Sequence, residues 1–393
     1  MTASLSVEPA DLEPDIDIPR FRDRLRAWLE KHSDVLAAWR DVHPANMEEA
    51  LPHGAKLLEL LWESGWGKGG WPEAVGGAGG SRALRAVLVD ELWAHDIDLP
   101  HQYDAIEVLG PMIADLRPDL GAQFFPALAT GREMWAQGFS EPEAGSDLAS
   151  LRTRATPEGD GFRLNGQKIW NSYAAASKRA FVLARTGAPE SRHRGLTMFF
   201  VDLDTPGLVV RPIALASGFN HLAEIFLDDV PVPADRVIGE VDGGWAVLMK
   251  LMQYERGSYA WQRQAKLLCR LRGLVSRLDT DDPAAPADVG RAYLRVLATR
   301  AKTARTVRRL DAGETLGPDT SVDKILLGFA EHTVADLARD LDPYGFLLDD
   351  SAAASHRYDD WWFSRATTIF GGAGEVQRGI VADRVLRLPT EKG

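Results

Sequence analysis

Hydrophobic residues recur at helical intervals over the first third of the chain. They do so at residues 19–29, 47–64 and 81–95, and the pattern continues to about residue 130. The stretch at 65–77 contains too many glycines for a regular element and predicts a loop. A proline near the start of the first helical stretch is compatible with a helix N-terminus, where no intrahelical amide donor is needed. We therefore predict that the chain begins with several helices.

From residue 133 the hydrophobic pattern shortens and its period changes. Four apolar runs, separated by Gly, Pro and Asp, are typical of short strands: residues 180–185, 196–203, 208–213 and 224–232. Between two further runs, Asn165-Gly166 is a strong signal for a two-residue hairpin turn. The pattern predicts a compact all-β region that ends near Pro233.

After residue 239 the spacing is helical again. A loop rich in Pro and Asp is expected at residues 279–287, and a break in the helices is expected at 342–345. The predicted order is helices, then strands, then helices. A length of 393 residues suits two or three domains.

The composition narrows the class of protein. A formal net charge of −12 argues against nucleic acid as a partner, because a phosphate backbone would be repelled. Cys269 is the single cysteine, so no intrachain disulfide can form, which fits a reducing compartment. The first residues are polar and acidic, unlike a secretion signal, and no uncharged run has membrane-spanning length. We expect a soluble protein of the cytoplasm.

The first segment that could bind a ligand or take part in a reaction lies at residues 138–147. Its sequence is Gly-Phe-Ser-Glu-Pro-Glu-Ala-Gly-Ser-Asp. Pro142 lacks an amide donor and Gly145 can adopt positive φ, so the segment cannot continue a helix. The hydroxyls of Ser140 and Ser146, together with unpaired backbone N–H groups, could bind a polar or anionic ligand. On composition alone, an ordinary polar loop is the better explanation.

A glutamate interrupts an apolar helical stripe in the C-terminal part of the chain. Glu255 falls on the apolar face of a predicted helix that begins near Trp245. A carboxylate on a buried face is unfavourable unless it is ion-paired or functional. Arg256 and Arg263 are near in sequence, and the pattern alone favours an ion pair with one of them.

A glycine-rich segment precedes the last predicted helix. Its glycines are Gly371, Gly372 and Gly374, and three apolar positions of the helix are expected to point inward: Val376, Ile380 and Val385. Free backbone N–H groups at such a helix start suit a phosphate or a developing negative charge. The alternative is a simple connection between two helices.

These segments resemble signature sequences of the acyl-CoA dehydrogenase family. Residues 138–147 resemble its TEPxAGSD motif, with Ser140 in place of the threonine. Residues 165–172 resemble its NGxKxWIT segment, and residues 369–378 resemble its YEGTxxIQR or YGGTNEIQR segment. Glu255-Arg256 matches the Glu-Arg pair that one branch of the family carries on the corresponding helix. The resemblance covers nearly the whole chain.

The resemblance implies an α+β fold of the acyl-CoA dehydrogenase type. It consists of an N-terminal helical domain (1–132), a middle β-barrel or β-sandwich domain (133–238) and a C-terminal four-helix bundle (239–393). It also implies FAD as the cofactor, an acyl-CoA substrate and electron transfer to an electron-transfer flavoprotein. The implied assembly is a homodimer or homotetramer, or a heterotetramer with a related subunit, two copies of each.

Many members of the family carry their catalytic base at the position of Gly371, which has no side chain here. The resemblance then implies Glu255 as the base that removes the α-proton. The N–H of Gly371 and a flavin ribityl hydroxyl would hold the thioester oxygen. The residues implied at the cofactor are Phe139, Ser140, Gly145, Ser146, Trp170, Ser172, Gly372, Ala373 and Glu375. Those implied at the substrate are Ser146, Tyr254 and Arg256, and no metal ligands are expected.

Several positions depart from the family pattern. The RxxFG motif has no convincing counterpart, and the glutamine of the QxxGGxG stretch is lost near residues 341–345. Ala373 replaces a threonine, Tyr173 replaces a small residue, and Ala223 replaces the asparagine of an HxNEVFFDDV strand. Such losses resemble a bacterial branch that acts on bulky CoA thioesters, including steroid side chains, some of whose members are mixed assemblies.

Two alternatives remain open on the sequence. One is a flavin oxidase or monooxygenase on the same fold, although Glu255 argues against a monooxygenase, since hydroperoxide chemistry does not need that base. The other is a non-catalytic or half-site subunit of a heteromeric acyl-CoA dehydrogenase. The loss of several motif residues that contact the flavin in this family suggests it.

Overall fold

The computed structural model describes residues 7, 9, 10, 12, 13, 15–276, 278 and 284–389. Its first part is helical, as predicted. The helices are α1 (Ile18–Lys31), α2 (Ser33–Leu36), α3 (Met47–Glu63), α4 (Ala83–Ala94), α5 (Gln102–Leu116) and α6 (Pro118–Ala129). Pro19 lies in the first turn of α1, where the Asp17 side chain accepts a hydrogen bond from the N–H of Arg20 at 2.7 Å.

An eight-stranded sheet follows these helices. Its strands are β1 (Trp135–Gly138), β2 (Arg154–Glu158), β3 (Gly161–Ser172), β4 (Arg179–Arg185), β5 (Leu196–Asp202), β6 (Leu208–Pro212), β7 (Leu222–Pro233) and β8 (Val237–Ile238). The strand order is β6-β7-β3-β2-β4-β5-β8, and β1 pairs in parallel with β4. β4 is buried along its whole length, so its faces are both covered. The predicted all-β region is therefore confirmed.

The hairpin predicted at Asn165-Gly166 is wrong. β3 runs through both residues without interruption, and the turn that joins it to β2 lies at residues 159–160. Gly166 lies at a bulge opposite β7, and a Cβ there would come within 2.5 Å of Thr153 Oγ1. The Asn165 side chain accepts a hydrogen bond from the N–H of Asp229 at 2.9 Å. The Asn-Gly pair thus lies at a bulge of β3, where Gly166 allows the close approach of Thr153, and it does not form a turn.

Helices return after the sheet: α7 (Gly244–Val275), α8 (Ala285–Asp311), α9 (Thr320–Leu341), α10 (Pro343–Leu348), α11 (Ala352–Ala366), α12 (Gly374–Ile380) and a last turn (Val381–Val385). The break predicted at 342–345 is present, but it is short, because Pro343 begins α10 directly after α9. Part of the loop predicted at 279–287 lies outside the described residues. Its last residues belong to α8, with Pro286 in the first helical turn.

The prediction that α12 points its apolar residues inward is wrong for two of them. Val376 and Val385 are each 39% exposed. The buried residue of α12 is Gln377, because the helix packs against α9 through that side. Two apolar side chains of this segment are therefore left on the surface of the single chain.

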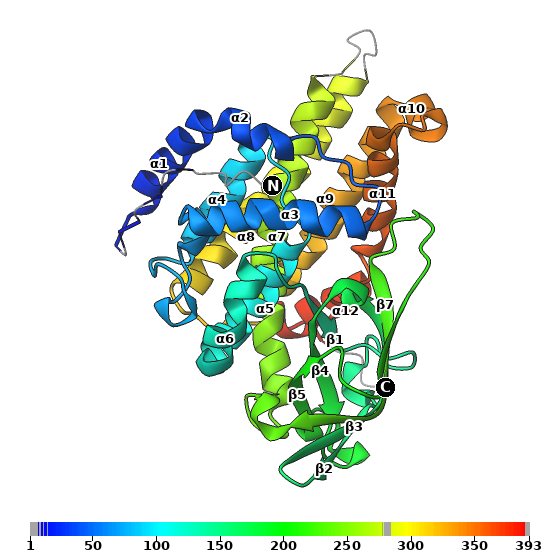
Figure 1. Ribbon diagram of the computed structural model, residues 1–393. Coiled ribbons are helices and arrows are strands. Elements are labelled where there is room, and N and C mark those ends of the chain that lie inside the picture. Colours follow the sequence, from blue (N-terminus) through cyan, green and yellow to red (C-terminus); the bar gives the residue numbers. More distant parts are fainter. Residues whose placement is uncertain are drawn as a thin grey trace.

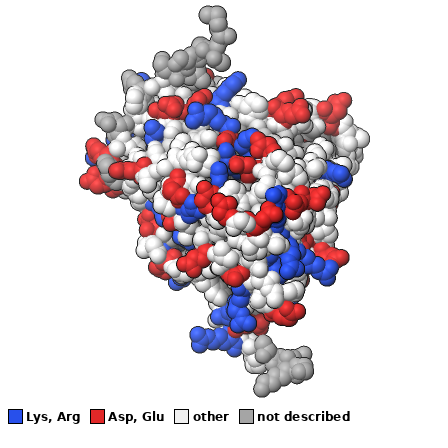
Figure 2. Space-filling view, turned by 60° about the horizontal axis from the view of Figure 1, so that its bottom comes forward, with Lys and Arg blue, Asp and Glu red and all other residues white. Residues whose placement is uncertain are grey.

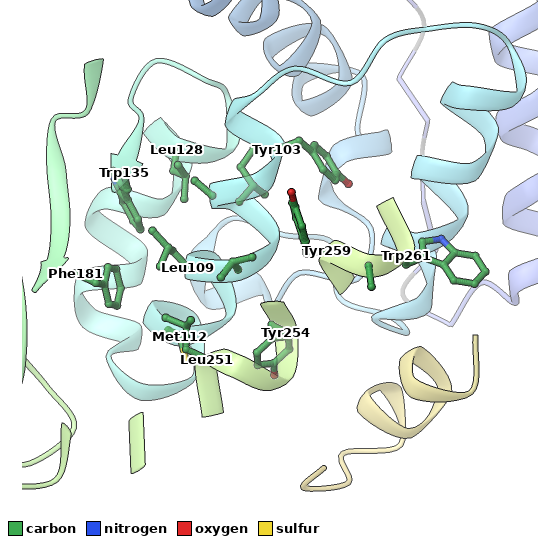
Figure 3. Close-up of a cluster of buried hydrophobic side chains, with 14 of the residues drawn as sticks. Tyr103, Leu109, Met112, Leu128, Trp135, Phe181, Leu251, Tyr254, Tyr259 and Trp261 are labelled. Atoms are coloured by element: carbon green, nitrogen blue, oxygen red, sulfur yellow. The ribbon is translucent and has the colours of Figure 1, made fainter. Parts of the chain in front are cut away.

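The helices and the sheet share one core. In Figure 1 the helices form the upper body, and the sheet lies below them; α5 packs against both α7 and β1, and α7 also packs against β5. Figure 3 shows Leu109 and Met112 of α5 between Trp135 and Phe181 of the strands and Leu251 of α7. Because interiors are close-packed, this cluster fixes α7 relative to the sheet. The predicted α+β class is confirmed.

The domain boundaries proposed from the sequence fall between secondary-structure elements. The boundary at 132/133 lies in the connection between α6 and β1, and the boundary at 238/239 lies between β8 and α7. Both boundaries stay predictions. Among the helices of the described ranges, we find none that is both long enough and apolar enough to cross a bilayer.

Candidate active site

The two residues predicted to carry the chemistry lie side by side. Gly371 follows α11 in a loop with φ +62°, and Glu255 lies in the first half of α7. A Cβ at Gly371 would lie 2.5 Å from Glu255 Oε1, closer than two such atoms can approach. The glutamate carboxylate thus occupies the place where a side chain at residue 371 would begin. A base on either element would reach the same point in space.

Glu255 has no bonded partner among the residues that the structure describes. Burial raises the pKa of its carboxyl, and the nearby cations Lys324 and Arg256 oppose that rise. Arg263, one of the two ion-pair candidates, instead donates to Glu331 at 2.5 Å. No ion pair between Glu255 and Arg256 is formed either. The ion-pair explanation of Glu255 therefore fails, and its carboxylate is available to a ligand.

Lys324 of α9 is a site residue to which no sequence motif points. Its side chain is 6% exposed, and its ammonium donates to the carbonyl oxygen of Thr367 and lies 4.1 Å from the centroid of the Phe370 ring. Burial lowers the pKa of Lys324 to about 8, with the Glu255 charge opposing. The signal available in the sequence was a charged residue on an otherwise buried helix face, as for Glu255.

The segment before the glycine-rich loop is held by α9. The Thr367 hydroxyl donates to the buried carboxylate of Glu331, while the Thr367 carbonyl accepts from Lys324. Gly372 has φ +102°, and a Cβ there would lie 2.0 Å from Gln377 Nε2. A side chain at residue 372 would collide with Gln377 and strain the backbone, so the turn requires glycine.

A buried ion pair fixes a second wall, on the sheet. Lys168 of β3 donates to Glu141 Oε1 at 2.8 Å and to the carbonyl oxygen of Phe139 at 3.1 Å. Glu141 also accepts from the N–H groups of Arg152 at 2.6 Å and Thr153 at 2.8 Å. Burial raises the pKa of Glu141, but these bonds and the Lys168 charge outweigh it and lower the pKa overall. The pair fastens the 138–147 loop to β3.

Ser140 and Trp170 become neighbours through this arrangement. The N–H of Ile169 donates to the carbonyl oxygen of Ser140 at 2.9 Å. Trp170 lies in a bulge of β3 with φ +63°, and its indole is 56% exposed. An exposed indole on a left-handed backbone is unfavourable in isolation, and a planar ring packed against it would remove part of that cost. These residues therefore fit the edge of a flavin.

The hydroxyl-bearing residues beside this wall are open to a ligand. Ser146 and Ser172 are exposed, and a Cβ at Gly145 would meet nothing within 4 Å. Two exposed arginines border the same turn: Arg152 pairs with Glu143 at 2.6 Å and Arg192 pairs with Asp147 at 2.6 Å, both through residues flanking Ser146. The turn thus offers hydroxyls and nearby cations, which suit phosphate groups.

The overall charge of the protein would not attract an anionic ligand to this turn. Figure 2 shows acidic and basic side chains interspersed over the face it presents, although the chain carries a net charge of −12. An acidic ligand such as CoA would meet no overall attraction from such a chain. Its binding must depend on the particular basic residues beside the site.

The remaining predicted residues lie in different environments. The Phe139 side chain, 7% exposed, belongs to the central core, so its backbone is what a ligand can meet. The buried Tyr254 accepts a hydrogen bond from Arg82 and lies against a small cavity between α4, α5 and α7. Ala373 is partly buried, and Glu375 is exposed and pairs with Arg378 at 3.4 Å. Arg256 is partly exposed beside Glu255, and its Nε has no partner among the described residues.

Family profiles match most of the second and third parts of the chain. The family described as "Acyl-CoA dehydrogenase, middle domain" matches residues 136–230. The family described as "Acyl-CoA dehydrogenase, C-terminal domain" matches residues 242–386. The matched ranges contain Trp170 in the first case and both Glu255 and Gly371 in the second.

Individual proteins resemble the chain over nearly its whole length. "Acyl-CoA dehydrogenase IpdE1" of Mycobacterium tuberculosis is 36% identical over 387 residues, covering 95% of this chain and 99% of that protein. The protein of the same name from Mycolicibacterium smegmatis is 31% identical, with 96% and 99% covered. Among solved structures, a variant of the Tcur3481-Tcur3483 steroid ACAD superposes with a TM-score of 0.81 at 25% identity, covering 95% of this chain and all of that one.

Proposed function

The chain belongs to the acyl-CoA dehydrogenase family, and on that premise we propose that it uses FAD to introduce an α,β double bond into a bulky acyl-CoA thioester, with Glu255 as the base. The observation that carries this proposal is the unpaired Glu255 carboxylate, 2.5 Å from the point where a side chain of residue 371 would begin. An enzyme of this family needs one base at that point, and Glu255 is the described carboxylate that reaches it.

Glu255 is suited to abstract a proton from a weak carbon acid. Burial already raises the pKa of its carboxyl, and a substrate that excludes the remaining water would raise it further. The charges of Lys324 and Arg256 oppose that rise and so favour the ionised carboxylate. The proton would pass from the α-carbon to Glu255, which has no competing hydrogen bond to break.

The glycine-rich loop is suited to hold the thioester oxygen. No described residue accepts a hydrogen bond from the N–H of Gly371, so this donor is free for the charge that develops on the oxygen. Lys324 and Glu331 hold the preceding Thr367, which fixes the direction of the loop. A preorganised donor of this kind needs no rearrangement when the enolate forms.

FAD, when bound, would supply the two-electron acceptor for the hydride that leaves the β-carbon. We assign Ser140, Trp170 and Ser172 to the flavin ring, and Ser146 with Gly145 to the phosphates and the CoA arm. Phe139 contributes its backbone, and Gly372, Ala373 and Glu375 line the opposite side. Tyr254 and Arg256 are assigned to the substrate. Electrons would then leave to an electron-transfer flavoprotein.

We propose a bulky, ring-bearing acyl group rather than a straight chain. The base on α7 takes the place where a side chain of residue 371 would begin, so residue 371 itself adds no bulk beside the α- and β-carbons. The structural neighbour described as a steroid ACAD supports this choice. Steady-state rates with butyryl-, octanoyl- and steroid-side-chain CoA thioesters test it, and a clear preference for a short straight chain would contradict it.

We further propose that the active form is an oligomer, either of this chain alone or with a related subunit. Exposed apolar residues on α10 support an interface there: Tyr344 at 78%, Leu347 at 72% and Leu348 at 78%. The neighbour's description joins two proteins, which favours the mixed assembly. The missing RxxFG motif also favours it, because a related subunit could supply the contacts to the adenine half of FAD.

Flavin content and anaerobic bleaching test the proposed function together. The chain should purify with FAD, or gain FAD on co-expression with a related subunit, and a panel of acyl-CoAs should bleach the flavin without oxygen. A colourless protein under both conditions would indicate a non-catalytic subunit. Oxygen consumption during turnover would indicate the oxidase alternative.

A further inference from the structure

A polar cavity lies further along the face of α7 that carries Glu255. Its volume is about 110 Å³, enough for several water molecules, and its walls come from α3, α4, α5, α7 and α11. Gln262 and Lys266 of α7 line it, and both share a helix face with Glu255, since they follow it by seven and eleven residues. Seven residues of helix span roughly 10 Å.

The cavity has hydrogen-bond donors that the described protein does not satisfy. Trp93 Nε1 and Gln262 Nε2 are buried and have no acceptor among the described residues, and each side chain is 5% exposed. Leaving a buried donor unpaired is unfavourable. Two such donors in one wall indicate a ligand that brings acceptor oxygens.

The cations of the wall already lie beside carboxylates, which limits what that ligand can be. Lys266 donates to Asp360 at 2.7 Å, and Arg270 lies 3.6 Å from the same carboxylate. Arg263 is paired with Glu331 at 2.5 Å. Asp98 and Asp104 also line the cavity. A carboxylate entering it would therefore meet groups of its own charge, and burying an unpaired charge is unfavourable. A neutral oxygen needs only the two free donors.

Residues that line the cavity contact a residue beside the proposed active site. The hydroxyl of Tyr173, next to Ser172, lies 3.3 Å from both Asp104 and His101, which line the cavity. Tyr259, one turn beyond Glu255, lies between the base and the cavity on α7 and is labelled in Figure 3. The unexpected tyrosine at residue 173 thus contacts two residues of the cavity wall.

We propose that this cavity receives the distal end of the acyl group and selects acyl groups that carry an uncharged oxygen, a ketone or a hydroxyl, roughly 10 Å from the carbon that Glu255 deprotonates. The free N–H groups of Trp93 and Gln262 donate to that oxygen. This inference rests on the proposed function and names the substrate class more closely.

The test compares three CoA thioesters on the FAD-loaded protein in its active assembly. They are decanoyl-CoA, its analogue with a ketone on the penultimate carbon, and the analogue with a terminal carboxylate. The ketone should be preferred over decanoyl-CoA in kcat/KM by about fivefold or more, the effect of one to two buried hydrogen bonds. The carboxylate should be the poorest of the three.

Variants then test whether the side chains of Gln262 and Trp93 cause the preference for the ketone. Gln262→Leu should bring the ketone-to-decanoyl ratio close to one. Gln264→Leu is the matched control, because Gln264 is buried on the opposite face of α7, where its Oε1 accepts from Arg300 at 3.2 Å, and it should keep the parent ratio. Trp93→Phe removes the second donor with little change of shape and should also lower the ratio. It serves as an independent variant should Gln262→Leu not fold.

Dissociation constants of the corresponding enoyl-CoA products give a readout without turnover, and they should show the same ranking and the same response to the variants. A parent protein that does not favour the ketone in either measurement would overturn the proposal. So would a Gln262→Leu protein and a Trp93→Phe protein that both keep the preference. If no thioester bleaches the flavin while the products still bind in the predicted order, the proposed function fails and the cavity's selectivity stands.

Discussion

Two glutamates on the two walls of the candidate active site differ in their hydrogen bonds and in the direction of their pKa shifts. Glu141, on the sheet wall, accepts hydrogen bonds from Lys168 and from the N–H groups of Arg152 and Thr153, and its pKa is lowered. Glu255, on the helix wall, also has a buried lysine nearby but accepts no hydrogen bond from a described residue, and burial raises its pKa.

We infer that the difference separates a structural carboxylate from the one proposed as the base. Every acceptor position used on Glu141 stabilises its ionised form and ties one segment to another, so proton uptake there would break the wall. The ionised form of Glu255 is favoured only through space, by the charges of Lys324 and Arg256. It can take a proton without losing a bond, which is what a general base requires. Burial alone would not distinguish the two residues, whereas their bonds do.

The largest effect is expected from Glu255→Gln. Turnover should fall by at least about 10³-fold, because glutamine keeps the size of the side chain but cannot accept the proton. The melting temperature should change little, since no bond of Glu255 is lost. Steady-state dye reduction and thermal melts check the two parts, and a lowered melting temperature with normal turnover would assign Glu255 a structural role.

Glu141→Gln should give the opposite result. It removes the charge that compensates the buried Lys168, which should lower the free energy of unfolding by about 3 kcal/mol while the rate per bound flavin stays close to the parent's. Because the folded pKa of Glu141 is lowered, its contribution is present above the ordinary glutamate range and is lost as pH falls through the lowered pKa. The variant should therefore lose part of the parent's acid dependence in urea unfolding.

Glu143→Gln is the matched control for that variant. Glu143 pairs with Arg152 at 2.6 Å on the open surface, where an ion pair contributes little. Its removal should change the free energy of unfolding by less than about 0.5 kcal/mol. An equal loss of stability in both variants would contradict the role given to the buried pair.

Gly371→Ala should reduce turnover by about 10²-fold through displacement of the base. The new Cβ would lie 2.5 Å from Glu255 Oε1, and the backbone has φ +62°, so the carboxylate or the loop must move. Gly379→Ala on α12 is the control, because a Cβ there would meet nothing within 4 Å. Equal turnover in the two variants would argue against the contact between residue 371 and Glu255.

Lys324→Met should shift the pH dependence of flavin reduction to higher pH. Removing the cation raises the pKa of Glu255, and the base works only when ionised, so the acid limb of flavin reduction should move to higher pH. Lys250→Met, which removes a cation of α7 that is paired with Asp115 at 3.1 Å, should leave the limb in place. A shift in both variants would indicate a general charge effect.

The order of the elements could be predicted from the sequence because it depends on local spacing. The strand runs after residue 180 and the helices around α3 and α4 follow directly from the apolar period. The Asn165-Gly166 hairpin failed because tertiary contact decided it: Thr153 passes too close for a side chain at Gly166. The inward direction of Val376 and Val385 failed because a single chain leaves that face uncovered.

The candidate site was predictable only in part. Glu255 could be noticed because it interrupts an apolar face, but only the family resemblance implied that it is the base and gave Gly371 a role. Lys168 with Glu141, and Lys324 with Thr367, could not be paired from the sequence, because residues 27 and 43 positions apart meet only through the fold. The cavity along α7 could not be predicted from the sequence either, because its walls come from five helices.

The most direct test of the central claim follows the α-proton itself. An acyl-CoA with sulfur at the β-position can lose an α-proton but no β-hydride, so exchange of its α-hydrogens with deuterium oxide isolates the step assigned to Glu255. Mass spectrometry should show exchange with the parent and with Glu141→Gln, and none above the uncatalysed rate with Glu255→Gln. Exchange by a folded, FAD-loaded Glu255→Gln protein at the parent rate would contradict the account.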